Sequence, residues 1–574
     1  MYDHIAVQTS KEYDAIVIGS GITGGWAAKE LTEKGLKTLV LERGRPITHG
    51  KDYITEHKGA WEFKFHGRGD RKLFEAEYPI QSRSGPVRED NVHFFINDKE
   101  HPYVQVKPFT WVQGNQVGGR SLTWGRQSYR WSDLDYEANL KEGIGVDWPI
   151  RYKDIAPWYN YVEDFIGVSG QAEGLSQLPD GHFLPPMEMT CAEKHVKEAV
   201  ERTFPERTMT IGRTAILTQP HNGRGACHYC GPCSRGCSVG AYFSSLSSTL
   251  PAAEATGNLT MRPFSLVHSL IYDEEKDRVT GVRVVDYNTK EVLEFFGRLV
   301  FLNASTLGST RILLNSKSPR FPNGLANSSG ALGHYLMDHH FRVGARGTVP
   351  GFEDKYYHGV RPNGIYIPRF RNIDKKTKMA DFVRGYGFQG GAGRESWGRG
   401  ISMPGLGADL KQALHEPGPW RMGLTAFGEM LPQYENFVEL DPGKKDAWGI
   451  PLLRIDCGYS DNEMAMRKDM AATAAEMLEA AGCTDVEPYD NFTEGGVGAE
   501  PGLGIHEMGT ARMGRDPKTS VLNAHNQAHD VPNLFVTDGA CMTSTACQNP
   551  SLSYMALTAR AVDYAASEMK NGNI

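Results

Sequence analysis

Four cysteines lie within eleven residues of this sequence, and their spacing is its clearest chemical signal. The segment ACHYCGPCSRGCSVG places Cys227, Cys230, Cys233 and Cys237 in a Cys-x2-Cys-x2-Cys-x3-Cys pattern. Bacterial ferredoxin segments use this thiolate spacing, so we expect an iron–sulfur cluster here. Zinc is an alternative, although zinc sites usually separate two Cys-x2-Cys pairs by about a dozen residues or more. Disulfides are a poorer alternative, because they would close only short loops.

A glycine-rich turn near the N-terminus has the form of a dinucleotide site. Gly19, Gly21 and Gly24 form Gly-x-Gly-x-x-Gly directly after the apolar run 15–18, and a helical stretch and a second strand ending at Glu42 follow. The glycines allow a tight turn, close approach of a pyrophosphate and close packing of helix on strand. Glu42 can accept hydrogen bonds from an adenosine ribose. The unit predicts a Rossmann-like site without choosing between FAD and NAD.

The C-terminal part of the chain supplies a candidate proton acceptor. The stretch HEMGTARMG begins at His506, the stretch NLFVTDGA contains Asp538, and Asn549-Pro550 precedes a helix-like segment. A neutral imidazole is a natural acceptor for a hydroxyl proton, because its pKa lies near neutral pH. The residues alone leave an equal alternative for His506, a loop histidine hydrogen-bonded to backbone.

The order of these motifs resembles the glucose–methanol–choline (GMC) flavin oxidoreductases, in which the N-terminal Rossmann unit and this tail together bind FAD. Three further segments are similar to that family: GGRSLTW from Gly118, FLNASTLGSTRILLN over 301–315, and LGHYLMDH over 332–339. The resemblance implies an α/β fold, with a Rossmann-like FAD-binding domain and an interleaved α+β substrate domain.

The resemblance also implies roles for individual residues. His506 takes the place of the catalytic base, and Asn549 takes that of the partner that hydrogen-bonds the substrate oxygen. Thr123 stands where pyranose-oxidase relatives carry a histidine bonded to the flavin, so we expect non-covalent FAD. The other residues expected to contact the cofactor through this resemblance are Gly118, Ser121, Val267, Asp538 and Pro550.

In the dehydrogenase branch of this family, similar cysteine insertions carry a surface cluster. By resemblance it is a [3Fe-4S] cluster held by Cys227, Cys233 and Cys237, and a fourth ligand from Cys230 would give a [4Fe-4S] cluster. Because a cluster carries one electron at a time, we expect a dehydrogenase whose electrons leave for cytochrome c or another acceptor. Within this branch a small partner subunit often carries the export signal, so we expect a periplasmic enzyme, with a cytoplasmic one as the alternative.

The substrate implied by the resemblance is a sugar, oxidised at C3 of a glucoside or pyranose. Polar and aromatic residues near the flavin segment suit a sugar, namely Trp124, Gln127, Tyr129 and Arg130. The alternatives are a pyranose or alcohol oxidase that uses dioxygen, and the flavin subunit of a glucose, gluconate or sorbitol dehydrogenase. A non-catalytic electron carrier is disfavoured, because it has no need of a base beside the flavin.

Composition limits the remaining classes of protein. The 574 residues contain 62 Lys and Arg against 69 Asp and Glu, a net charge of −7, which argues against a nucleic-acid binder. No apolar run approaches the ~20 residues of a membrane span. The first residues, MYDHIAVQTSKEYD, have neither the basic leader nor the apolar stretch of a signal peptide. The five cysteines outside the cluster are expected to pack in the core: Cys191, Cys457, Cys483, Cys541 and Cys547.

The elements that position these residues are expected in two interleaved sets. The FAD-binding domain is expected from residues 1–125, 215–335 and 500–574, and the substrate domain from 126–214 and 336–499. We expect two or three strands over 258–296, an amphipathic helix over 461–481 and a mobile glycine-rich loop over 385–406.

Three further acid and imidazole side chains near these motifs have structural interpretations. Packing is the favoured role of His339 and His340, and Glu507 is expected to point away from His506 as a solvated or structural acid.

Overall fold

The computed structural model describes residues 12–574. Residues 1–11, which include most of the segment inspected for an export signal, lie outside the described residues. The predicted Rossmann unit is present as β1 (Tyr13–Ile18), α1 (Ile22–Glu33) and β2 (Thr38–Leu41), with β1 and β2 parallel. Gly24 allows the close packing predicted for it, since a Cβ there would lie 1.9 Å from the carbonyl oxygen of Gly19.

The first sheet has the order β7-β2-β1-β10-β9-β8, and β18 (Leu534–Val536) pairs with β10. The segment from 258 to 296, expected to hold two or three strands, contributes to four. They are β7 (Leu259–Arg262), β8 (Ser265–Asp273), β9 (Arg278–Asp286) and β10 (Val292–Leu302). Because β10 is parallel to β1 but antiparallel to β9, it joins the Rossmann strands to the β8–β9 meander.

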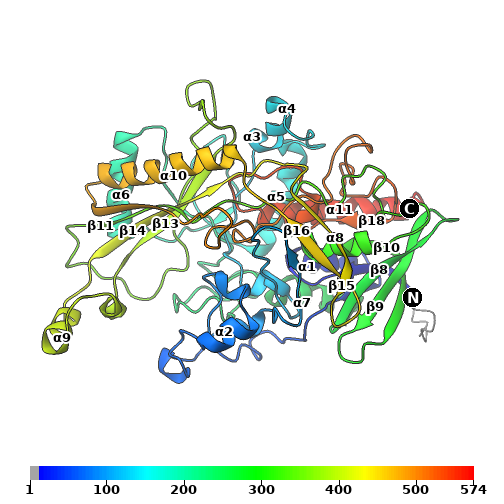
Figure 1. Ribbon diagram of the computed structural model, residues 1–574, viewed down its shortest axis with the longest axis horizontal. Coiled ribbons are helices and arrows are strands. Elements are labelled where there is room, and N and C mark those ends of the chain that lie inside the picture. The colour runs from blue at the N-terminus through cyan, green and yellow to red at the C-terminus, as the bar shows by residue number, and fades with distance from the viewer. Residues whose placement is uncertain (1–11) are drawn as a thin grey trace.

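Helices from distant parts of the chain cover this sheet. The C-terminal helix α11 (Ser551–Lys570) packs against α1 and against α5 (Tyr152–Ile166). Helix α7 (Thr249–Ala255) also contacts α1, and α8 (Thr306–Asn315) lies against β8. Figure 1 shows this lobe on the right, with the C-terminal helix beside the strands of the sheet.

The second sheet forms the other lobe, on the left in Figure 1, with α10 (Asp461–Ala480) lying across it. Its order is β17-β11-β14-β13-β12-β6. The strands are β17 (Thr484–Asp490), β11 (Val343–Val349), β14 (Trp420–Gly428), β13 (Tyr386–Arg394), β12 (Ile365–Ile367) and β6 (Thr210–Ile211). Helices α10 and α6 (Cys191–Thr203) pack on the sheet through a shared apolar core.

The prediction of a mobile loop over 385–406 was wrong for its first part, which is the interior strand β13. Its glycines serve close strand packing rather than flexibility. A Cβ at Gly390 would lie 2.1 Å from the carbonyl oxygen of Gly423, and a Cβ at Gly364 would lie 1.9 Å from that of Gly390. Glycine is therefore required where the backbones of neighbouring strands come this close.

Smaller elements complete the fold. A three-stranded sheet joins β15 (Phe437–Lys445), β16 (Pro451–Asp456) and β3 (Val104–Gln105), and β4 (Val168–Ser169) pairs with β5 (Phe183–Leu184). Short helices include α2 (Arg71–Glu77), α3 (Asp133–Tyr136), α4 (Ala138–Glu142) and α9 (Gly407–His415). None of the helices in residues 12–574 is both long and apolar enough to span a membrane.

The two larger sheets draw their strands from different parts of the chain. All strands of the first sheet come from the ranges assigned to FAD binding, and all strands of the second come from the ranges assigned to the substrate domain. The boundaries of the two domains themselves stay a prediction.

Candidate active site

A cavity of about 780 Å³ lies where the two sheets meet. The turn between β1 and α1, the segment 119–127 and the C-terminal tail line it from the first lobe. Gln389 of β13 and Phe427 of β14 line it from the second lobe. Such a junction can hold a cofactor on one side and a substrate on the other.

One end of the cavity has the features of a dinucleotide site. Gly19, Gly21, Glu42 and Val267 all line it. Glu42 is buried, and its Oε2 accepts hydrogen bonds from the backbone nitrogen of Ser20 (3.1 Å) and from its hydroxyl (2.6 Å). A Cβ at Gly21 would meet nothing within 4 Å, and no side chain caps α1 at this residue. The free N–H groups of the helix N-terminus therefore face an open space suited to phosphates.

Unpartnered polar atoms beside the cavity support a bound ligand. Among residues 12–574, Nε2 of Gln113 and Oδ1 of Asn303 are buried without a hydrogen-bond partner in the protein, and both residues line the cavity. Buried polar groups are normally satisfied, so these atoms fit a ligand that supplies the missing contacts. The residues present therefore fit the FAD that the motifs imply.

Some of the residues predicted to contact the cofactor line the cavity, and others do not. Ser121, Thr123 and Asp538 line the cavity, whereas Gly24, Gly118 and Pro550 do not. Gly118 adopts a φ of +88°, which favours glycine, and its backbone nitrogen donates to the Ser20 hydroxyl at 2.9 Å. Direct FAD contact by Gly24, Gly118 and Pro550 stays a prediction, since Gly24 lies in α1 against the Gly19 carbonyl, Gly118 shapes a turn and Pro550 is buried at the start of α11.

Two of the four residues expected to favour a sugar lie elsewhere. Trp124 and Gln127 line the cavity, but Tyr129 and Arg130 do not. Tyr129 is fully buried and stacks on Tyr366 with ring centroids 4.0 Å apart, and Arg130 is paired with a buried glutamate. The prediction was wrong for these two because the stretch that lines the cavity, 123–127, ends before them and the chain then enters the core.

The candidate catalytic pair is together in the structure. Nε2 of His506 lies 3.2 Å from Nδ2 of Asn549, and both residues line the cavity. Asp338 positions the His506 backbone by accepting its N–H at 2.9 Å and by accepting the N–H groups of Gly502 and Gly504. The structure thus brings base and partner within reach of one bound hydroxyl, although their catalytic roles stay a prediction.

The surroundings of His506 favour a neutral imidazole. Burial, together with the nearby His339 and Arg120, lowers the pKa of His506 well below its ordinary value. Glu507 does point elsewhere, as expected, and it forms a buried ion pair with Arg120 at 2.9 Å. A neutral ring is the form that can accept a proton.

Two contacts of the pair were missed from sequence. His339, interpreted as a packing residue, places its Nδ1 2.8 Å from Nδ1 of His506. Gln389 donates to Oδ1 of Asn549 at 2.6 Å. His339 lies in the LGHYLMDH segment, 167 positions from His506. Gln389 lies in the stretch interpreted as a loop. No pattern in the neighbouring sequence therefore predicts either contact.

The cysteine loop lies beside the cavity, but its thiols do not form a ready metal site. Cys227, Cys233 and Cys237 are half-buried, whereas Cys230 is exposed. Burial raises the pKa of the Cys227 thiol, and the three other thiols raise it further, so all four are near one another. Nevertheless, no three His, Cys, Asp or Glu side chains of residues 12–574 are arranged to hold a metal ion. The iron–sulfur cluster therefore lacks structural support beyond the composition of the loop.

The five other cysteines behave as expected for packing residues. None of the nine cysteines forms a disulfide in the described part of the chain. Cys457, Cys541 and Cys547 are buried, and Cys191 and Cys483 are half-buried.

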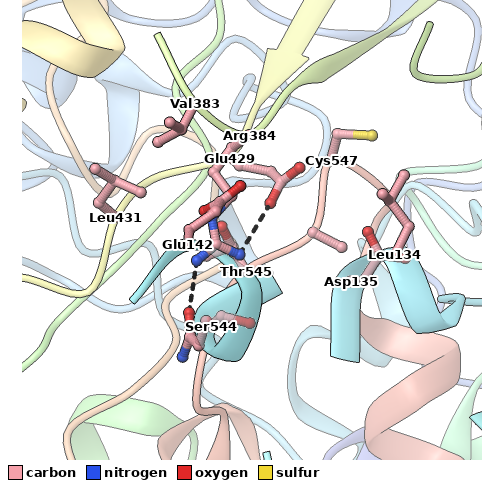
Figure 2. Close-up of polar contacts among 12 residues, drawn as sticks. Leu134, Asp135, Glu142, Val383, Arg384, Glu429, Leu431, Ser544, Thr545 and Cys547 are labelled. Carbon is pink, nitrogen blue, oxygen red and sulfur yellow. Dashed lines mark hydrogen bonds and ion pairs between the residues drawn. The ribbon is translucent and has the colours of Figure 1, made fainter. Parts of the chain in front are cut away.

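The tail that leads to Asn549 passes beside a buried cluster of charges. Figure 2 shows Glu142 and Glu429 around the guanidinium of Arg384, with Asp135 and Cys547 nearby. Arg384 Nε lies 2.6 Å from a Glu142 oxygen and its NH1 lies 4.0 Å from a Glu429 oxygen. These groups come from α3, α4 and the ends of β13 and β14, so the cluster links short helices to the second sheet.

Comparison with known proteins agrees with this architecture. Two family models, both described as GMC oxidoreductase, match residues 13–341 and 432–558. The unmatched residues between them contain β11, β12, β13 and β14, of which β13 and β14 supply Gln389 and Phe427 to the cavity.

Two enzymes and one solved structure illustrate the similarity. The 2-methyl-1,2-propanediol dehydrogenase of Mycolicibacterium austroafricanum is 28% identical, with 97% of this chain and 95% of that one covered. The fructose dehydrogenase large subunit of Gluconobacter japonicus is 26% identical, with coverage of 97% and 98%. A formate oxidase structure from Aspergillus oryzae RIB40 superposes with a TM-score of 0.61 at 13% identity, over 98% of this chain and 100% of that one, which supports the fold alone.

Proposed function

Because the chain belongs to the GMC oxidoreductase family, we propose that it is a dehydrogenase that oxidises a sugar hydroxyl, at C3 of a glucoside or pyranose. Its family binds FAD and acts on alcohol and sugar hydroxyls, and that coarser function belongs to this chain as well. The observation that carries the finer proposal is the pairing of His506 with Asn549 at a cavity whose other end is suited to a dinucleotide.

The geometry supports a separate role for His506 and for Asn549. Nε2 of His506 accepts the hydroxyl proton, and Nδ2 of Asn549 donates a hydrogen bond to the same oxygen. FAD, held without a covalent bond by the residues of the dinucleotide end and with Thr123 among the lining residues, would supply an acceptor for the hydride that leaves the carbon. The alcohol thereby becomes a carbonyl compound, with one proton on the enzyme and two electrons on the cofactor.

A sugar is favoured by the lining of the substrate side. Trp124 offers an aromatic face, and Gln127 and Gln389 offer amide groups that suit hydroxyls. The similarity to a fructose dehydrogenase large subunit points to the same substrate class.

We further propose that the cysteine loop holds an iron–sulfur cluster when the enzyme is mature. Ser234, the residue after Cys233, lines the cavity, while Cys230 is exposed to solvent. The loop therefore extends from the active site to the surface. A cluster there would supply a carrier of single electrons for cytochrome c or another acceptor. By analogy with the large-subunit relative, a small partner subunit and export to the periplasm belong to the same proposal.

The substrate and the base are tested together. Purified enzyme is offered D-glucose, methyl α-D-glucoside, D-fructose, D-gluconate, D-sorbitol and 2-methyl-1,2-propanediol, with an artificial dye as acceptor. We expect dye reduction by a sugar or glucoside without peroxide, and no turnover in a His506→Ala variant that keeps its flavin. Peroxide in proportion to substrate would instead support the oxidase alternative, and normal turnover of His506→Ala would remove this residue from the mechanism.

The cluster is tested by metal and sulfide analysis of the same protein. Iron with acid-labile sulfide is expected, and Cys233→Ser should slow cytochrome c reduction while substrate still bleaches the flavin at the wild-type rate. Zinc without iron, or unchanged cytochrome c reduction in Cys233→Ser, would contradict this part of the proposal.

A further inference from the structure

The fully buried side chain of His339 connects the candidate base to a backbone carbonyl. Its Nδ1 lies 2.8 Å from Nδ1 of His506, and its Nε2 is hydrogen-bonded to the carbonyl oxygen of Ala546. The two rings are nearly perpendicular, with an interplanar angle of 80° and centroids 4.9 Å apart. His339 does not line the cavity, so its contact with the reaction passes through His506.

The carbonyl of Ala546 fixes the direction of each hydrogen bond in the series that leads through His339 to His506. A carbonyl oxygen can only accept, so the proton of neutral His339 must be on Nε2. Its Nδ1 then has a lone pair, and His506 must donate to it from Nδ1. A neutral His506 with its proton on Nδ1 has an unprotonated Nε2.

The hydrogen bonds on the other side of His506, at Asn549 and Gln389, agree with this direction. Nδ2 of Asn549 faces the unprotonated Nε2 of His506 at 3.2 Å, and Nε2 of Gln389 donates to Oδ1 of Asn549 at 2.6 Å. An amide turned the other way would place two acceptors together at His506 and two donors together at Gln389. Donors and acceptors thus alternate without conflict from Ala546 to Gln389.

We propose that His339 is a positioning residue that fixes the tautomer of His506, so that the lone pair of Nε2 always faces the hydroxyl to be oxidised. The inference rests on the proposed role of His506 as base. When His506 accepts the proton at Nε2, its Nδ1–H keeps a neutral acceptor in His339. In the opposite tautomer Nε2 would carry a hydrogen and could accept nothing.

The charges around the pair are compatible with this arrangement. Burial lowers the pKa of His339 to about 4, which keeps that ring neutral at working pH. The charged groups that face the pair are Arg120, in its ion pair with Glu507, and Asp338, which accepts the His506 backbone N–H. None of them contacts Nδ1 of either ring, so the Ala546 carbonyl remains the group that decides the proton position.

Three variants separate positioning from packing. His339→Leu removes both hydrogen bonds, whereas His339→Gln keeps an amide oxygen for the Nδ1–H of His506 and an N–H for the carbonyl of Ala546. His340→Leu is the matched control, because His340 is the next residue, is equally buried and does not hydrogen-bond to His506. Flavin content and Tm report whether each variant is folded and loaded.

The kinetic readout is anaerobic bleaching of the flavin by the fastest sugar of the panel above. We expect His339→Leu to lower the limiting rate by about 10²-fold with little change in KM, the scale on which a correctly placed proton acceptor contributes. His339→Gln should recover most of that rate, and His340→Leu should stay near the wild type. Equal rates for His339→Leu and His340→Leu, or a His339→Gln variant as slow as His339→Leu, would overturn the inference.

A second readout does not depend on turnover. In protein labelled with ¹⁵N-histidine, the signals of His506, identified by their loss in His506→Ala, distinguish a protonated from an unprotonated ring nitrogen. Wild type should show a proton on Nδ1 alone, and His339→Leu should show exchange between both tautomers. A wild-type His506 protonated on Nε2 would overturn the inference even if His339→Leu does not fold. If His506→Ala turns over normally, the proposed function fails; if that variant is inactive and His339→Leu is not slowed, the positioning role alone fails.

Discussion

His506 owes its properties to its position rather than to its sequence neighbours. Burial is the largest cause of its lowered pKa, and the nearby His339 and Arg120 add to it. The adjacent acid, which would raise that pKa in isolation, is instead paired with Arg120 at 2.9 Å. The ring is therefore held neutral at a site where a proton must be accepted.

This pKa shift predicts the pH dependence of the reaction. An ordinary histidine with a pKa of about 6.5 would be roughly three-quarters protonated at pH 6 and unable to act as a base. Because the pKa of His506 is lowered, its neutral form persists as the pH falls. We expect the limiting rate of flavin reduction by sugar, measured by anaerobic stopped flow, to be unchanged between pH 8 and pH 6. A decline centred near pH 6.5 would contradict this.

At the scale of elements, β13 shows how a strand can have the composition of a loop. Gly387 and Gly390 lie where the backbones of β12 and β14 approach it, and Gln389 between them reaches Asn549. The side chain that touches Asn549 is therefore held by an interior strand. A rigid strand positions such a group more accurately than a loop would.

Two substitutions in β13 distinguish close packing from flexibility. Gly390→Ala would bring a Cβ within 2.1 Å of the Gly423 carbonyl oxygen, so β13 and β14 must separate, at a cost of about 1–3 kcal/mol. Gly393→Ala is the matched control in the same strand, because a Cβ there meets nothing within 4 Å. Thermal unfolding should show a lower Tm for Gly390→Ala and a nearly unchanged Tm for Gly393→Ala. Equal Tm values would mean that the strand is not packed in this way.

At the scale of the whole molecule, the buried charge cluster of Figure 2 links α4 to the second sheet. Arg369 pairs with Glu429 at 2.7 Å, and Arg384 pairs with Glu142. With Asp135, three acids face two arginines. Burial raises the pKa of Asp135 to about 6 and that of Glu429 to about 7, so the native cluster retains a proton that the unfolded chain releases near pH 4.

The cluster predicts a stability that declines as the pH rises. Between about pH 4 and pH 7 the native state binds more protons than the unfolded state, so the free energy of unfolding falls by up to about 1.4 kcal/mol per pH unit for each such proton. Glu429→Gln leaves two acids for two arginines and removes the group of this cluster whose pKa is raised to about 7. Its Tm should therefore change less with pH than that of the wild type.

The control for this prediction is Glu439→Gln, which removes an exposed acid that is paired with Arg454. This variant should follow the wild-type dependence of Tm on pH. Parallel curves for wild type and Glu429→Gln would show that the buried acids do not control stability in this range.

The sequence alone determined the parts of this protein that depend on local spacing. The β1–α1–β2 unit with Gly19, Gly21 and Gly24 follows from a turn that only small residues permit, and the motif order identified the family and the candidate pair His506 and Asn549. The cysteine pattern likewise defines a loop of clustered thiols, although its cluster stays a prediction. In each case the physical requirement lies within a few neighbouring residues.

Tertiary structure alone decided which distant groups meet. His339 reaches His506 across 167 positions, and Gln389 reaches Asn549 across 160, through contacts that no periodicity encodes. Burial, which lowers the pKa of the base and raises those of Asp135 and Glu429, also depends on the packed fold. Hydrogen-bond direction and desolvation arise from neighbours in space, so they become visible only when the chain is folded.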